Sequence, residues 1–391
     1  MADIEKIMSV SASDIEKIMG VEKDDIEKVM GVEIPSNAWY GDRGIAGGYN
    51  RYGRSSGTWY TNNIQYRSIS GSSHCQKFGE FAAIGSDANV SVFKCSGVSG
   101  GGRGMFQGGD TSTNGGSSFP YANKHWYITI ASTGDASTGT DMPSYTPAGG
   151  SLITGHAFDS QAGSSDGTTG IIAASGFGQT FYNTMSSTGA AALGGTLITQ
   201  WSSFGGGGGG TYAFFVGYKT GGTDAIEYMA FATPGNNASG WGDLARTGQF
   251  HKTCSSDTRS ITWGFYGNTD LSGEGSAPVT DAMEYWSHAS TGNASTFGNT
   301  TGIYCSTNDT TFGKYSGFAL SNGTRGERWT GWTITVDNQP NGSDCNYIGD
   351  MNVDFVTIAS TGNAADSGYN FADLDSTGMS YTDHYGAGIS G

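Results

Sequence analysis

Two patterns of hydrophobic and polar residues divide the sequence. Residues 1 to about 34 carry an apolar face that recurs every eleven residues, whereas from Trp39 onward large and small residues alternate over short stretches. The first pattern is typical of helical turns, and the second is typical of short strands that end in tight turns. Because Pro35 separates the two patterns, we predict an N-terminal arm at 1–35 and a β domain at 36–391.

The arm repeats one motif three times. Its copies are Asp3–Met8 (DIEKIM), Asp14–Met19 (DIEKIM) and Asp25–Met30 (DIEKVM), each followed two residues later by a valine. Aspartate is a preferred helix N-cap, and Gly20 and Gly31 stand where a helix normally stops, so each copy predicts one small helix. A continuous right-handed supercoil is the alternative for an eleven-residue period, but the glycines favour separate turns.

Helices of six residues are not stable alone in water, so the apolar face of the arm predicts a partner surface that completes it. A disordered acidic leader is the alternative interpretation. The apolar positions that we expect to dock on a partner are Ile4, Ile7, Met8, Ile15, Ile18, Met19, Ile26, Val29 and Met30.

A longer repeat fills the rest of the chain. Its clearest half is a strand that begins with an aromatic anchor and runs into a Thr-Gly turn, as in Tyr285–Ala294 (YWSHASTGNA) and Phe355–Ala364 (FVTIASTGNA). The six anchors are Tyr66, Tyr127, Tyr182, Tyr228, Tyr285 and Phe355. A hydrophobic residue followed by glycine often comes shortly afterwards, at Phe78-Gly79, Leu193-Gly194, Trp241-Gly242 and Phe297-Gly298. Another strand precedes each anchor, and in four copies it begins with an arginine, at Arg43, Arg103, Arg259 and Arg325.

Six copies of roughly 58 residues, each with several short strands, predict an all-β fold of the β-propeller type. We expect six blades, and seven is the alternative if the spacers at 140–165 or 336–352 contain another unit. The first arginine strand follows the arm directly, while the C-terminal stretch 378–386 has no partner in the repeat. The C-terminal tail is therefore expected to supply the missing strand of the first blade and to close the ring.

Composition and charge narrow the functions that this domain can have. Glycine supplies 66 residues and aromatic residues 12 %, so large rings must build most of the core. The formal net charge of -16 argues against nucleic-acid binding, and no apolar run approaches the roughly 20 residues of a membrane span. Met1–Lys6 lacks the start of a signal peptide, which predicts a protein made in the cytoplasm. Five cysteines without a CxxC pair predict reduced, packed thiols.

Residues that could carry chemistry are sparse. The six histidines show no metal-binding spacing, and no Lys-Ser/Thr of a phosphate loop follows Gly205–Gly210, which we interpret as a flexible connection between blades. The repeated arginines are expected to bond neighbouring carbonyls or carboxylates. Exposed tryptophans could stack on sugars, although most are expected in the core. The candidates are Trp59, Trp126, Trp241, Trp263, Trp286, Trp329 and Trp332. We predict no catalytic residue, cofactor or metal, and hence no enzyme.

The glycine doublets Gly47-Gly48 before Tyr66 and Gly108-Gly109 before Tyr127 resemble kelch repeats. Together with the Ala-Ser-Thr-Gly-Asn-Ala turns and the repeated DIEKVMGV of the arm, the chain resembles kelch-like virion structural proteins of marine tailed phages, especially cyanophages. This resemblance implies a non-enzymatic component of a virus particle that is assembled in the host cytoplasm. The arm would dock the ring onto capsid, tail or sister subunits, with the chain as a homo-oligomer.

Two other functions remain open. A tail fibre or receptor-binding module would use the ring to recognise host surface glycans. A carbohydrate-active enzyme of the galactose-oxidase kind would need a copper cluster of tyrosine and histidine.

Overall fold

The computed structural model divides the chain into two compact units, Met1–Ala38 and Trp39–Gly391. It describes residues 6–7, 10–11, 17–18, 21–22, 28–29, 32–33, 41–48, 50–52, 58–60, 62–82, 90–93, 95–113, 124–143, 162–174, 178–199, 203–218, 225–246, 248, 251–263, 281–301, 303–305, 310–312, 317–336, 345–371, 381–383 and 387–390.

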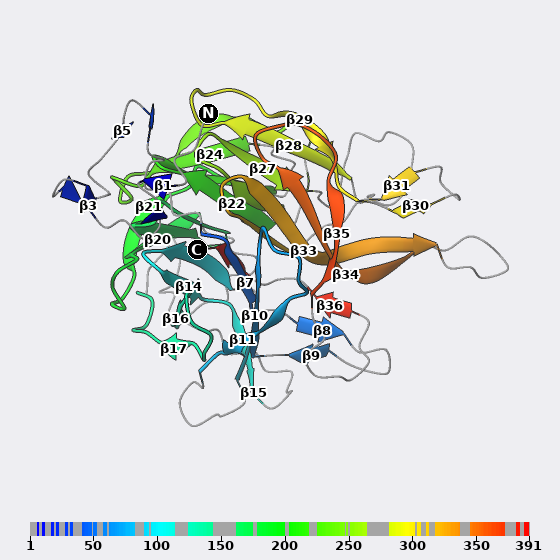
Figure 1. Cartoon of the computed structure of the whole chain (residues 1–391), viewed down its shortest axis with the longest axis horizontal. Coiled ribbons are helices and arrows are strands. Elements are labelled where there is room, and N and C mark those ends of the chain that lie inside the picture. Colours follow the sequence, from blue (N-terminus) through cyan, green and yellow to red (C-terminus); the bar gives the residue numbers. More distant parts are fainter. Residues whose placement is uncertain are drawn as a thin grey trace. The chain divides into compact units, whose positions relative to one another are not determined.

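The second unit is built from six four-stranded antiparallel sheets, which we call blades 1 to 6 (Figure 1). From the innermost strand outward, blade 1 contains β37 (Ala387–Ser390), β7 (Arg43–Gly47), β10 (Asn63–Ser68) and β11 (Gln76–Glu80). Blade 2 contains β13 (Ser96–Gly100), β14 (Arg103–Gln107), β16 (His125–Thr129) and β17 (Ser137–Thr138). Blade 3 contains β18 (Ala162–Ser165), β19 (Thr169–Ala173), β20 (Gln179–Thr184) and β21 (Ala192–Thr196).

The remaining three blades follow the same order along the chain. Blade 4 contains β22 (Ser203–Gly209), β23 (Tyr212–Tyr218), β24 (Ala225–Ala230) and β25 (Ser239–Asp243). Blade 5 contains β26 (Lys252–Ser255), β27 (Arg259–Trp263), β28 (Ala282–Ser287) and β29 (Ser295–Asn299). Blade 6 contains β32 (Phe318–Ser321), β33 (Arg325–Val336), β34 (Cys345–Thr357) and β35 (Ala365–Asn370).

The innermost strands contact one another in a closed cycle, in the order β37, β13, β18, β22, β26, β32 and back to β37. This cycle confirms the predicted six-bladed β-propeller. It leaves no place for a seventh blade, because the inner strands of blades 2 and 3 contact each other on either side of the first long spacer, and β33 contacts β34 across the second.

The C-terminal strand closes the ring, as predicted. β37 pairs with β7, and Ile389 lies opposite Ile45. The closing strand is Ala387–Ser390 rather than the stretch 378–386. Within that stretch, β36 (Tyr381–Asp383) instead pairs with β8 (Asn50–Tyr52), which also pairs with β9 (Thr58–Tyr60). Joining the two ends of the domain in one sheet removes an open edge.

Aromatic side chains fill the core, as the composition predicts. Trp126, Trp263, Trp286 and Trp329 are among the largest fully buried side chains. The contacts between blades 1 and 2, 4 and 5, and 5 and 6 combine such rings with aliphatic residues, so stacked blade faces provide much of the burial that a chain poor in aliphatic residues needs. Cys75, Cys95 and Cys254 are free, buried thiols, which confirms the prediction for these three residues.

The prediction of helical turns in the arm is wrong for the residues of the arm that the structure describes. They form three two-residue antiparallel pairs, β1 (Lys6–Ile7) with β2 (Val10–Ser11), β3 (Lys17–Ile18) with β4 (Val21–Glu22), and β5 (Lys28–Val29) with β6 (Val32–Glu33). Two residues separate the strands of each pair, and in the last two copies the second of them is glycine. A glycine in a two-residue connection suits a hairpin, so the same residue that ends a helix can also turn a strand.

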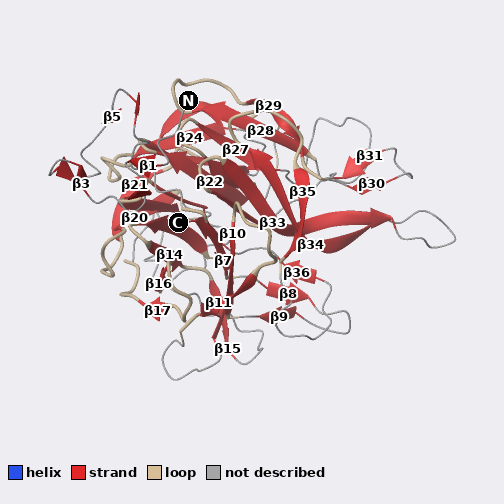
Figure 2. Cartoon of the chain, viewed as in Figure 1, coloured by secondary structure: helices blue, strands red, loops and turns tan. Residues whose placement is uncertain are grey.

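Figure 2 shows strands and loops and no helix in the described part of the chain. Accordingly, no helix among these residues is long and apolar enough to cross a membrane.

Candidate functional site

The two faces of the ring differ in their connections. On one, which we call the turn face, the first strand of blades 2 to 6 joins the second through turns of two or three residues, such as Gly101–Gly102, and in every blade the third strand joins the fourth through seven or eight residues. On the other, which we call the insertion face, the second strand joins the third and each blade joins the next. Several of these connections are long, such as those over residues 108–124, 139–161 and 264–281.

Extra strands gather on the insertion face. They are the β8, β9 and β36 sheet, the pair β12 (Val90–Phe93) and β15 (Asp110–Thr113), the pair β30 (Ile303–Cys305) and β31 (Thr310–Phe312), and the outer ends of β33 and β34. β9 contacts β12, β36 contacts β34, and β30 contacts β33. The additions of blades 5, 6, 1 and 2 are therefore neighbours. Figure 1 shows the long β33–β34 hairpin extending beyond the other strands of its blade.

The arm holds the nine predicted docking positions. Ile7, Ile18 and Val29 lie in β1, β3 and β5. They occupy the same position of three pairs with the same register, in which each faces a valine: Val10, Val21 and Val32. The other six positions, Ile4, Met8, Ile15, Met19, Ile26 and Met30, lie outside the described residues.

The repeated arginines lie at the turn face, and Arg43, Arg103 and Arg325 bond neighbouring carbonyl or carboxylate groups as predicted. Arg43 Nη1 donates to the carbonyl oxygen of Ile130 (2.6 Å), and Arg103 Nη1 donates to that of Met185 (3.1 Å), each in the next blade. Each guanidinium also lies over the aromatic anchor of its own blade. The pairs are Arg43 with Tyr66 (4.8 Å), Arg103 with Tyr127 (5.5 Å), Arg259 with Tyr285 (4.8 Å) and Arg325 with Phe355 (3.7 Å). These cation–π pairs fix the end of the second strand on the third.

Thr-Gly turns join neighbouring blades. In blade 5 the backbone N–H of Gly292 donates to Trp241 O (2.9 Å), and that of Ala294 donates to Asp243 O (2.8 Å), both in the outer strand of blade 4. The turn of blade 6 binds the outer strand of blade 5 in the same way. A Cβ on Gly242 would lie 2.1 Å from Gly292 O, so the hydrophobic-Gly pair marks where a neighbouring turn approaches.

Glycine and serine are prominent in the lining of the central channel. Because these residues are small, the inner strands can approach one another closely, and the channel is narrow. Its two connected spaces have volumes of about 40 and 90 Å³. The interpretation of Gly205–Gly210 as a flexible connection is wrong, because most of this run forms β22, the innermost strand of blade 4. A Cβ on Gly206 would lie 2.7 Å from Gly163 O, and one on Gly207 would lie 2.5 Å from Ser255 Oγ. The run lets three inner strands approach one another.

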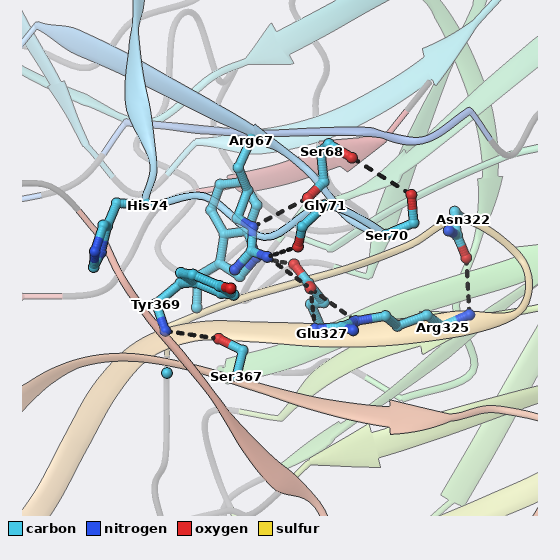
Figure 3. A network of polar contacts seen from close by, with 12 residues as sticks. Arg67, Ser68, Ser70, Gly71, His74, Asn322, Arg325, Glu327, Ser367 and Tyr369 are labelled. Atoms are coloured by element: carbon cyan, nitrogen blue, oxygen red, sulfur yellow. Dashed lines mark hydrogen bonds and ion pairs between the residues drawn. The ribbon is translucent and has the colours of Figure 1, made fainter.

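A buried ionic network lies where blade 6 meets blade 1 (Figure 3). Glu327 Oε1 accepts hydrogen bonds from Arg325 (2.9 Å), and Glu327 Oε2 accepts one from the indole N–H of Trp329 (2.8 Å). Arg67, from blade 1, lies 3.6 Å from Glu327 Oε1, and both side chains are fully buried. Burial raises the pKa of Glu327, although Arg67, Trp329 and Arg325 oppose that rise.

Further contacts at the boundary between blades 6 and 1 hold Arg67 and the neighbouring turn in place. Arg67 Nη2 donates to Gly71 O (2.9 Å), and its guanidinium lies 5.1 Å from the Tyr369 ring centroid. Asp42 accepts from the backbone N–H of Ser70 (2.8 Å) and from the amide of Asn322 (3.0 Å), which joins blade 1 to the first turn of blade 6. The network thus reinforces the boundary between blade 6 and blade 1.

Buried titratable groups elsewhere also connect elements. Glu227 of blade 4 accepts the backbone N–H groups of Ile198 (2.7 Å) and Thr199 (2.8 Å), which follow the outer strand of blade 3. Burial raises its pKa. Burial lowers the pKa of both His251 and His288 to about 4, so both are neutral near pH 7. Among the described residues, no three His, Cys, Asp or Glu side chains form a group suited to a metal.

Most candidate tryptophans are core residues, as expected. Trp126, Trp241, Trp263, Trp286 and Trp329 are all buried and cannot offer a ring face to a sugar. The side chains of Trp59 and Trp332 lie outside the described residues.

No protein-family model matches the chain, and no curated protein is significantly similar to it. The closed cycle of inner strands defines its class, a six-bladed β-propeller.

Sequence reasoning missed the role of the residue after the Thr-Gly pair in blades 2, 5 and 6. Asp135, Asn293 and Asn363 accept a backbone N–H from the outer strand of the preceding blade, and in blade 4 Asn237, two residues after Gly235, does the same. The signal was present, because the same residue types recur at this position beside the hydrophobic-Gly pairs.

Proposed function

We propose that the chain is a non-enzymatic structural protein of a tailed-phage particle, in which residues 1–35 dock the ring onto capsid or tail proteins or onto sister subunits. The observation that supports this function most is the threefold arm. Three two-residue pairs share one register at an eleven-residue spacing. Hairpins this short are at best marginal in water, so they require a partner. A periodic arm suits a partner that is itself repetitive, as particle surfaces are.

The ring supports a carrier role. Ligand pockets are typically about 300–1,000 Å³, whereas the channel spaces have volumes of about 40 and 90 Å³. Buried carboxyl groups such as those of Glu227 and Glu327 bind protein groups at blade boundaries. Contacts with large partners therefore fall to the arm and the outer surface. With a net charge of -16, we propose neither nucleic acid nor membrane insertion among these contacts.

The second candidate function is recognition of host surface glycans by the insertion face. The observation that favours it is the continuous row of extra strands from blades 5, 6, 1 and 2. Long connections on a rigid scaffold are where binding residues concentrate. In this function the chain is a tail fibre or receptor-binding module, and the arm anchors it in the particle.

Particle incorporation tests the arm. Ile7→Asp, Ile18→Asp and Val29→Asp are combined in the full chain, and copies per purified particle are counted by quantitative mass spectrometry. We expect at least a tenfold loss. The matched control combines Leu193→Asp with Ile198→Asp, two exposed apolar side chains of the ring (45 % and 64 % exposed), and should be incorporated normally.

Equal incorporation of the arm variant and the control would contradict the docking role of the arm. Binding of the full chain to an array of host glycans separates the second function from the first. Saturable binding that is lost when the β33–β34 hairpin is shortened would favour glycan recognition.

A further inference from the structure

The inner strands begin at the insertion face, and they surround a small space at this end of the channel. All six blades contribute to this space of about 40 Å³. One residue from each blade near this end illustrates the lining: Ser96, Ala162, Gly205, Lys252, Phe318 and Ala387. A space of this size holds one or a few groups the size of a water molecule and no larger ligand.

Two hydroxyls that line this space need hydrogen-bond partners. Ser96 is 1 % exposed and Thr253 is 7 % exposed. In the part of the chain that the structure describes, neither Ser96 Oγ nor Thr253 Oγ1 has a partner. Because leaving a buried hydroxyl unpaired costs about 1–3 kcal/mol, a bound group that accepts both O–H bonds stabilises the fold.

A lysine supplies a cationic donor at this end of the channel. Lys252 is the charged residue among the described residues that line the space. Burial, with a smaller contribution from Arg328, lowers its pKa to about 8, so it stays mostly protonated at pH 7. Arg328 lies opposite Asp354 in the β33–β34 register, and burial raises the pKa of the nearby Cys95 thiol to about 12, which keeps it neutral.

We propose that this end of the channel binds one small inorganic anion of halide size, held by the ammonium group of Lys252 and the hydroxyls of Ser96 and Thr253. Ammonium and hydroxyl groups are all donors, and hydrogen bonds to an ion are roughly twice as strong as neutral ones. The small lining residues let the inner strands surround the ion. The anion would bridge blades 2 and 5, which share no strand pairing, and this role is independent of the proposed docking function.

Bromide is the probe. Thermal unfolding of the full chain is followed while bromide replaces fluoride at constant ionic strength. Because bromide is the weaker stabiliser in nonspecific salt effects, a saturable rise of the unfolding midpoint indicates site binding. We expect this rise in the unaltered chain, at least tenfold weaker bromide affinity in Ser96→Ala, and no rise in Lys252→Met. Lys77→Met, which removes an exposed lysine, should behave like the unaltered chain.

A crystal grown with bromide gives a readout that does not depend on stability. The expected anomalous peak lies in the channel beside Lys252 and is absent from Ser96→Ala crystals or much weaker there. If the channel holds only water, or if bromide shifts the midpoint of the unaltered chain and of Ser96→Ala equally, the proposal is wrong. These two tests decide the matter even if Lys252→Met does not fold.

Discussion

Asn293 Oδ1 accepts a hydrogen bond from the backbone N–H of Asp243 (3.1 Å), across the boundary between blades 5 and 4. The same bond occurs at four other boundaries. Its acceptors are Asp135 for Glu80 (3.0 Å), Asn237 for Thr196 (3.1 Å), Asn363 for Asn299 (3.0 Å) and His74 for Asn370 (3.0 Å). At the closing boundary a ring nitrogen of His74 thus replaces the amide or carboxylate oxygen. One type of hydrogen bond therefore joins successive blades, including blade 6 to blade 1.

Asn293→Ala should lower the free energy of unfolding by about 1 kcal/mol, because a backbone N–H loses its acceptor. Asn293→Asp should stay within about 0.5 kcal/mol of the unaltered chain, since Asp135 makes the equivalent bond in blade 2. Urea unfolding measures both values. Equal losses in the two variants would show that the side-chain oxygen is not what matters.

Gly242→Ala should destabilise the chain by about 1–3 kcal/mol, the usual cost of overpacking. Its Cβ would lie 2.1 Å from Gly292 O, a backbone atom that cannot rotate away. Gly240, in the same strand, has nothing within 4 Å of such a Cβ, so Gly240→Ala is the matched control and should be tolerated. If thermal unfolding shows the same midpoint for both variants, the close approach of the turn is not a constraint.

Glu327→Gln should cost about 3 kcal/mol, because it leaves the buried guanidinium of Arg67 without its carboxylate. The contrast is Lys77→Ala, which breaks the exposed pair with Glu80 and should cost less than about 1 kcal/mol. Denaturant unfolding at one pH compares the two losses. Similar small losses would mean that the seam between blades 6 and 1 does not depend on this ion pair.

Acid should destabilise the ring through His251. Its ring bonds Thr262 Oγ1 (3.1 Å) and Gly248 O (3.0 Å), and burial lowers its pKa to about 4. Between about pH 6.5 and pH 4 the unfolded chain binds a proton that the folded chain does not. Stability is therefore lost as the pH falls through this window, by up to about 3 kcal/mol from this residue.

The comparison with His251→Gln isolates this effect, since His288 adds a loss in the same direction and the raised pKa of Glu327 acts in the opposite direction. We expect the dependence of unfolding free energy on pH to be flatter in the variant between pH 4 and 6.5. Parallel curves would rule out His251 as a source of the acid sensitivity.

The repeat of the ring could be read from the sequence because it is local. Anchors such as Tyr285, the Thr-Gly turn and the arginine strand all lie within one blade, so spacing alone predicts six sheets. The missing strand of blade 1 also predicts closure by the C-terminal tail, although not its register.

The features that the sequence did not reveal depend on contacts between residues that lie far apart in the chain. Arg67 and Glu327 are 260 positions apart and meet only when the ring closes. Gly205–Gly210 resembles a flexible loop when the sequence is considered alone. In the ring, the inner strands of blades 3 and 5 lie so close to this run that side chains on it would collide with them. In the arm, a glycine that can end a helix can equally turn a hairpin, so the local pattern permits both structures.

Hydrogen exchange at the C-terminal strand tests the closed ring most directly. The amides of β37 pair with β7 in one sheet, so they should exchange as slowly as those of β13, the innermost strand of blade 2, which pairs with β14 in the same way. Exchange of residues 387–390 at the rate of an unstructured peptide, with β13 still protected, would contradict closure of the six-bladed ring by its C-terminus.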